Sequence, residues 1–253
     1  MNRRNRMLAS NHSGQMLIVA ALAIAILIST TVMYTYELAR EHYSQTDREI
    51  SDFIQQVKQA TQNMVTSSLA NASNSAESTV FLSNSAKLAQ LIRSLHLYEV
   101  SNLSLTLRND STYNEGVKLS WTAEGVGTSS ACVDAVLHVK GFSTDVTATY
   151  SVNVTTTMMI EGHYVVEGSE KNVTLKCRTY NENKSSSVEN VTLYYNDSGN
   201  WAKVTDYSTV SYGNGTYVFS FFVTVAAENV EVSAHVLDSR GIYVQANMTC
   251  YAQ

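Results

Sequence analysis

Asn-x-Ser/Thr triplets are the most frequent pattern with a chemical meaning in this chain of 253 residues. In an exported protein such triplets accept N-linked glycans. Eleven occur, and ten follow residue 36, where the 17 Asn and 50 Ser or Thr would give about 4 by chance. Alternation of polar and apolar residues places the asparagines on polar strand faces or in turns. We therefore predict glycans at several of nine sites: Asn102, Asn109, Asn153, Asn172, Asn183, Asn190, Asn196, Asn214 and Asn247. Asn11 would lie on the cytoplasmic side, unmodified, and Asn71 stays open.

The three cysteines are too few for a disulfide scaffold or a four-thiolate zinc site. Cys177 and Cys250 share the inward-facing parity of two predicted strands. They form either a possible disulfide, which an extracellular compartment would allow, or two buried free thiols. Cys132 has outward parity and no evident mate.

No residue pattern indicates catalysis. The six histidines show no metal-binding spacing, Gly-x-Ser-x-Gly is absent, and the Gly-rich triplets lie in predicted hairpin turns. We therefore expect no enzyme, no catalytic residue, no metal, no cofactor and no small-molecule substrate. A net charge of −5 argues against nucleic acid as a partner.

The first forty residues contain the most informative segment. Met7–Tyr36 holds no charged residue, and the 19 residues of Met16–Tyr34 are close to the ~20 needed to cross a bilayer. Arg3, Arg4 and Arg6 precede the segment and Glu37 follows it, which predicts a cytoplasmic amino terminus and an extracellular remainder. Three interpretations of this segment compete. It is a cleaved secretory signal, an uncleaved signal anchor, or a signal cleaved before the apolar run. A secretory signal would be followed by an Ala-x-Ala cleavage site, and none follows the apolar run.

The stretch Ser13-Gly14-Gln15-Met16-Leu17-Ile18, with basic residues upstream, resembles the class III signal of archaeal type IV pilins and pilin-like proteins. The resemblance implies that a prepilin peptidase cuts between Gly14 and Gln15. The helix beginning at Gln15 would then leave the membrane and pack against copies of itself on a pilus assembly platform. His12 and Ser13 depart from the family, which often has Lys or Arg there.

Helical periodicity continues beyond the apolar segment. Apolar residues recur at three- and four-residue steps from Ile50 to Ser68, which predicts one helix over 15–69 with an interruption at Asn71, and a second helix over 76–98. From Asn102 the period becomes two and predicts four strands, over 102–107, 117–121, 133–139 and 146–154. A long helix on a four-stranded antiparallel sheet is also the pilin architecture.

A second β unit is predicted from Gly162. Its strands begin with 172–178 and continue over 190–195, 201–205, 216–225, 230–237 and 242–250, separated by Gly- and Asn-containing turns. Six or seven short strands in about 90 residues predict a β-sandwich. The stretches 213–221 and 229–241 resemble immunoglobulin-like modules of prokaryotic surface proteins.

These observations predict a membrane-anchored α+β chain: a long amino-terminal helix, transmembrane and then amphipathic, with a second helix on a four-stranded antiparallel sheet, followed by an all-β immunoglobulin-like sandwich. The predicted domains are a signal segment over 1–14, a transmembrane or filament-core helix over 15–36, a pilin-like domain over 37–161 and the sandwich over 162–253.

The expected function is that of a structural subunit of a pilus-like surface filament, exposing a glycosylated domain for adhesion or surface contact. The alternatives are a non-filamentous single-pass surface glycoprotein (an adhesin or receptor) and a minor component of a secretion or assembly machine. The expected location is the cell membrane, and the cell-surface filament after processing.

Overall fold

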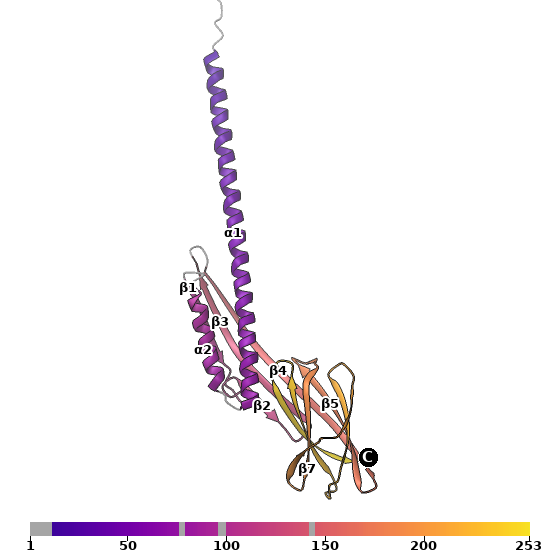
Figure 1. Ribbon diagram of the computed structural model, residues 1–253. Coiled ribbons are helices and arrows are strands. Elements are labelled where there is room, and N and C mark those ends of the chain that lie inside the picture. Colours follow the sequence, from indigo (N-terminus) through magenta and orange to yellow (C-terminus); the bar gives the residue numbers. More distant parts are fainter. Residues whose placement is uncertain (1–11, 76–78, 96–99, 142–144) are drawn as a thin grey trace, which may run out of the picture. The chain divides into compact units, whose positions relative to one another are not determined.

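The computed structural model describes residues 12–75, 79–95, 100–141 and 145–253 (Figure 1). Its contacts divide the chain into two units, residues 1–55 and 56–253, which are described separately. In the first unit the described residues are helical and belong to helix α1 (His12–Ser75). The second unit holds the last part of α1, helix α2 (Thr79–Ser94) and all the strands.

Twelve strands are described, and they make the second unit predominantly β. In chain order they are β1 (Val100–Leu107), β2 (Val117–Trp121), β3 (Val126–Lys140), β4 (Asp145–Glu167), β5 (Glu170–Asn181), β6 (Lys184–Ser185), β7 (Val188–Asp197), β8 (Asn200–Lys203), β9 (Ser208–Ser211), β10 (Thr216–Val223), β11 (Val230–Asp238) and β12 (Tyr243–Ala252).

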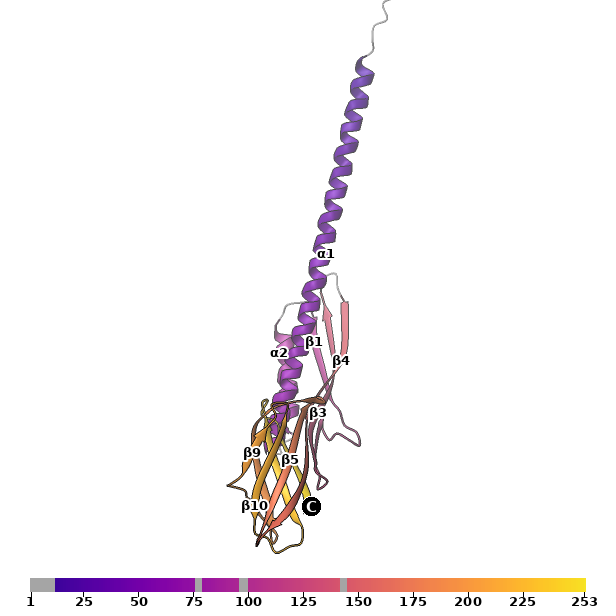
Figure 2. The same cartoon turned by 90° about the vertical axis from the view of Figure 1, so that its right-hand side faces the viewer.

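One part of the second unit is a helix-covered sheet. β3 pairs antiparallel with β4 on one edge, and with β1 and β2 in succession on the other. The apolar face of this sheet packs against α2 and the last turns of α1 (Figure 2). Phe81 of α2 is fully buried there, with Leu69 of α1 and Val133 of β3. Burial of apolar surface of this kind is the main favourable term in folding.

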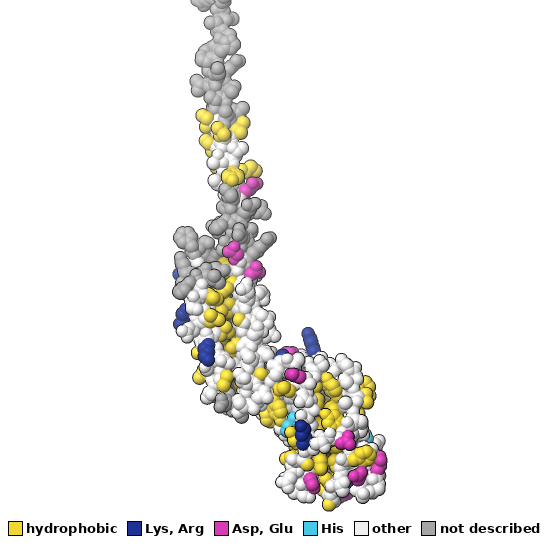
Figure 3. Space-filling view, viewed as in Figure 1, with side chains coloured by type: hydrophobic (Ala, Val, Ile, Leu, Met, Phe, Trp, Pro, Cys, Tyr) yellow, Lys and Arg dark blue, Asp and Glu magenta, His cyan; other side chains and the backbone are white. Residues whose placement is uncertain are grey.

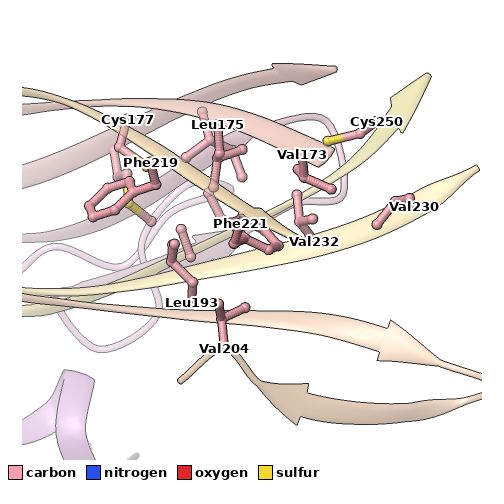
Figure 4. Close-up of a cluster of buried hydrophobic side chains, with 14 of the residues drawn as sticks. Val173, Leu175, Cys177, Leu193, Val204, Phe219, Phe221, Val230, Val232 and Cys250 are labelled. Atoms are coloured by element: carbon pink, nitrogen blue, oxygen red, sulfur yellow. The ribbon is translucent and has the colours of Figure 1, made fainter. Parts of the chain in front are cut away.

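The other part is a sandwich of two sheets. β5, β10 and β9 continue the sheet from the carboxyl half of β4, while β12, β11, β7 and β8 form the opposing sheet. The sheets meet at one edge, where Tyr251 and Ala252 of β12 pair parallel with His163 and Tyr164 of β4. The apolar core between them includes Leu175 and Phe221, which are almost completely buried (Figure 4).

β4 joins the two parts. Its residues 145–159 pair with β3, and its residues 156–167 pair with β5 on the opposite edge. The buried face keeps one parity along the strand, so Val154 belongs to the helix-covered core and Met158 and Ile160 to the sandwich core. The predicted domain boundary between 161 and 162 therefore falls inside a continuous strand.

The predicted fold class, a membrane-anchored α+β chain with a separate immunoglobulin-like domain, is wrong. Most described elements are strands, and the helix-covered sheet and the sandwich share β4 within one unit. Gly162 suggested a break, yet it lies within the strand, where a Cβ would come within 3.0 Å of Cys250 Sγ. The missing side chain therefore serves close packing instead of a turn.

The membrane-spanning part of that prediction is corrected as well. Among the residues that the structure describes, no helix has both the length and the apolarity needed to cross a membrane. The helix also continues to Ser75, past the interruption predicted at Asn71.

Candidate assembly, modification and junction sites

An apolar segment of α1, residues 24–36, leaves its large side chains uncovered within its own unit (Figure 3). Leu27 is 66% exposed, Ile28 60% and Met33 69%. These side chains cover several helical faces, since Leu27 and Ile28 are about 100° apart around the axis. A continuous exposed apolar surface usually marks a site of contact with another molecule or with lipid.

The hydroxyl groups of the same segment are bonded to its own backbone. Ser29 Oγ donates to the Ala25 carbonyl at 2.8 Å, and Thr31 Oγ1 to the Leu27 carbonyl at 2.8 Å. Thr30 and Thr35 make equivalent bonds. Burying a hydroxyl costs free energy unless it is hydrogen-bonded. The segment can therefore enter an apolar environment without leaving these groups unsatisfied.

The processing residues Gly14 and Gln15 lie in the first turns of α1, where the structure describes the backbone. The basic residues Arg3, Arg4 and Arg6 and the asparagine Asn11 lie outside the described residues.

The nine predicted glycan sites differ in exposure. Six are exposed: Asn102, Asn109, Asn153, Asn183, Asn190 and Asn214. Asn172, Asn196 and Asn247 are half-buried. The structure does not bring the nine together: they are spread from β1 to β12.

Hydrogen bonds separate these sites further. The amide nitrogen that would carry the glycan is already a donor in Asn172, to Glu167 Oε1 at 2.9 Å, and in Asn196, to Glu231 Oε2 at 2.7 Å. Modification there would break those bonds. In Asn102, Asn153 and Asn214 the side-chain oxygen is the bonded atom, which leaves the nitrogen available.

The three cysteines are free and buried. Burial raises the pKa of the Cys177 and Cys250 thiols to about 12. The possible Cys177–Cys250 disulfide is not formed, and the two cysteines lie apart (Figure 4). Cys177 lies opposite Ile160, whereas Cys250 packs beside Gly162, two positions further along β4. Cys132 is also buried despite its outward parity, because the 108–116 segment folds along β3, with Arg108 N donating to the Cys132 carbonyl.

A polar cluster that the sequence analysis missed lies where β4 meets the turn after β11. Asp238 is only 1% exposed, and its carboxylate accepts hydrogen bonds from Arg240 Nε, Thr156 Oγ1 and two backbone N–H groups. Arg240 also donates to Glu182 Oε1 at 2.7 Å. The sequence identified Asp238–Gly241 only as a turn, because nothing in it shows that β4 lies alongside.

Backbone contacts close the same junction. The β2–β3 hairpin inserts between β4 and β12: Gly125 N donates to the Asn247 carbonyl at 2.8 Å, and Ile160 N donates to the Gly125 carbonyl at 2.7 Å. At the end of α1, Ser73 Oγ accepts from Tyr243 N at 3.0 Å. The helix, the long strand and the sandwich are thereby fixed to one another within the second unit.

A row of rings lies on the outer face of the β7–β11–β12 sheet. The centroids of Tyr194 and His235 are 4.5 Å apart, those of His235 and Tyr243 5.6 Å, and those of Tyr243 and Trp121 5.2 Å. Burial lowers the pKa of His235 and so favours the neutral form of its ring. Alternation could have placed Tyr194 with Asn190 on one face, but the pairing of β7 with β11 could not be predicted.

The described residues contain no group of three or more His, Cys, Asp or Glu arranged to hold a metal ion. Comparison with protein-family models, with curated proteins and with solved structures gives no match.

Proposed function

We propose that this chain is a structural subunit of a cell-surface filament. The apolar segment of α1 packs against the same segment of other copies, and the β-rich unit is displayed outward for adhesion or surface contact. The observation that carries this proposal is the uncovered apolar surface of residues 24–36, together with the internal hydrogen bonds of its hydroxyl groups. A helix that is apolar on several faces needs neighbours on several faces, and a bundle of copies supplies them.

Two further features agree with this proposal. Of the nine predicted glycan sites, which all lie in the second unit, six have an exposed asparagine. Exposed acceptors suit an outward-facing glycosylated surface. The Asp238 cluster links β4 to the turn before β12, and the helix-covered sheet and the sandwich belong to one unit that could be displayed as a whole.

The test is to shear filaments from the cell surface and to identify their subunits and amino termini by mass spectrometry. We expect this chain in the filaments, starting at Gln15. Leu27→Arg would place a charge in the apolar bundle and abolish its incorporation, whereas Gln62→Arg, at an exposed polar position of the same helix, would not. Recovery of the chain only in membranes, with residues 1–14 intact, would contradict the proposal.

The second candidate is a non-filamentous surface glycoprotein (an adhesin or receptor) whose apolar segment is covered by lipid and not by copies of itself. The same exposed side chains support it, because lipid chains also cover an apolar helix on all faces. In that case the chain remains in the membrane fraction after shearing, and Leu27→Arg changes the amount of the chain that can be extracted from membranes. A minor subunit of an assembly machine would differ only in its low copy number.

A further inference from the structure

A shallow hollow of about 220 Å³ lies on the outer face of the β7–β11–β12 sheet. Its lining includes Asn190, Thr192 and Tyr194 of β7, His235 of β11 and Tyr243 of β12. Strand register explains this grouping. Leu237 pairs with both Asn190 and Tyr243, and His235 pairs with Thr192, so the side chains form adjacent rows on one face.

The hollow contains a complete glycan acceptor. Asn190-Val191-Thr192 is one of the Asn-x-Thr triplets, and both of its polar side chains line the hollow. Asn190 is exposed, and among the described residues its amide makes no hydrogen bond, in contrast to the amides of Asn172 and Asn196. The nitrogen is therefore free to form the glycosidic linkage.

The hollow also offers surfaces suited to a sugar ring. The aromatic rings of Tyr194 and Tyr243 are half-buried and lie on either side of His235. The faces of aromatic rings carry partial negative charge, and the C–H groups of a pyranose carry partial positive charge, so the two stack favourably. The volume is below the roughly 300 Å³ at which pockets for drug-sized ligands begin, which fits one sugar ring better than a larger ligand.

We propose that Asn190 is a glycosylation site whose first sugar folds back into this hollow and packs against Tyr194 and Tyr243. The glycan then covers the ring row and stabilises the β7–β11–β12 sheet, so it is part of the packed structure and not only a solvated coat. This inference rests on the proposed surface display, which exposes the chain to glycosylation.

The first experiment is peptide mass mapping of the full chain purified from its own cells. We expect a glycan on the Asn190 peptide. Modification of other sequons without Asn190 would overturn this inference and leave the proposed surface display intact. Absence of glycan from every Asn-x-Ser/Thr triplet would overturn the inference and also remove the surface glycosylation on which it rests. Filament shearing tests the proposed function independently.

The second experiment measures the thermal midpoint of the full chain. In glycosylated protein, Asn190→Gln should lower the midpoint by several degrees, and Thr192→Ser, which keeps the triplet, should not. Asn214→Gln, which removes a triplet in an open turn, is the matched control and should leave the midpoint unchanged. In protein made without glycosylation, Asn190→Gln should also have no effect.

The role of the rings is tested by combining substitutions. If the sugar packs on Tyr194, the effect of Asn190→Gln should vanish in a Tyr194→Ala background, because the contact is already lost. An effect of the same size in both backgrounds would overturn the packing of the sugar on this ring.

Discussion

Arg240 Nε donates to Asp238 Oδ2 at 2.9 Å, and this ion pair lies at the junction between β4 and the turn that precedes β12. The Asp238 side chain is 1% exposed and that of Arg240 23%. The remaining carboxylate positions accept bonds from Thr156 and from the N–H groups of Arg240 and Ile242. A charge buried this deeply is tolerated because it is paired and fully hydrogen-bonded.

Asp238→Ala should reduce the free energy of unfolding by about 3 kcal/mol, since it leaves the Arg240 guanidinium and several donors without their partner. The measurement is denaturant unfolding followed by circular dichroism. Asp206→Ala, at an exposed position, is the matched control and should change stability by less than about 0.5 kcal/mol. Equal effects of the two substitutions would show that the Asp238 cluster does not hold the junction.

Glu182→Gln should have a much smaller effect, although Glu182 accepts from the same arginine at 2.7 Å. Its side chain is 44% exposed, and ion pairs that water reaches contribute about 0 to 1 kcal/mol. A double-mutant cycle with Arg240→Gln measures the coupling of the pair. A coupling energy above about 2 kcal/mol would contradict the expectation that Glu182 contributes much less to stability than Asp238.

Gly127→Ala should lower the free energy of unfolding by about 2 to 3 kcal/mol. The added Cβ would lie 2.0 Å from the Gln245 carbonyl oxygen and push β3 away from β12. Gly168→Ala is the control. It meets no atom within 4 Å and bears only the strain of its φ of +68°, about 1 kcal/mol. If Gly168→Ala were the more damaging of the two, the close approach of β3 to β12 would not be the constraint.

The buried thiols should resist alkylation. With pKa values of about 12, Cys177 and Cys250 are thiolates about 1,000-fold less often at pH 8 than thiols of the ordinary pKa of 9.0. We expect iodoacetamide to leave both unmodified in the folded chain and to modify both in denaturant, as measured by mass spectrometry. Rapid modification of folded Cys177 would contradict its burial.

Stability should fall on acidification through the titration of His235. Burial lowers the pKa of His235 in the folded state below its ordinary 6.5, so the unfolded chain binds this proton more readily. The stability that the buried neutral His235 contributes is therefore fully present above pH 6.5. It is lost as the pH falls through the pKa of His235 in the folded state. His235→Gln should flatten the dependence of the thermal midpoint on pH over this range. An unchanged dependence would show that other groups cause it.

The repeat spacing of apolar residues along each segment is readable from the amino-acid sequence alone. Runs such as Leu103–Leu107 and Val133–Val139 alternate apolar and polar residues, and the structure has strands there because alternation places one side of each strand in a core. The turns around Gly199, Gly213 and Gly241 were also predictable, since each glycine has a positive φ that other residues adopt at a cost. The uncharged character of residues 24–36 was evident from composition alone.

Which of these strands pair with one another follows only from the folded chain. Strand β4 runs through Gly162, where the sequence predicted that a second β unit begins, because a glycine marks a turn and a close approach equally well in a sequence. The position of Thr156 beside the Asp238–Arg240 pair depends on contacts between segments far apart in the chain. So does the position of Asn190 in one hollow with His235 and Tyr243, which follows from strand register. Register follows from the packing of whole sheets, which no single segment encodes.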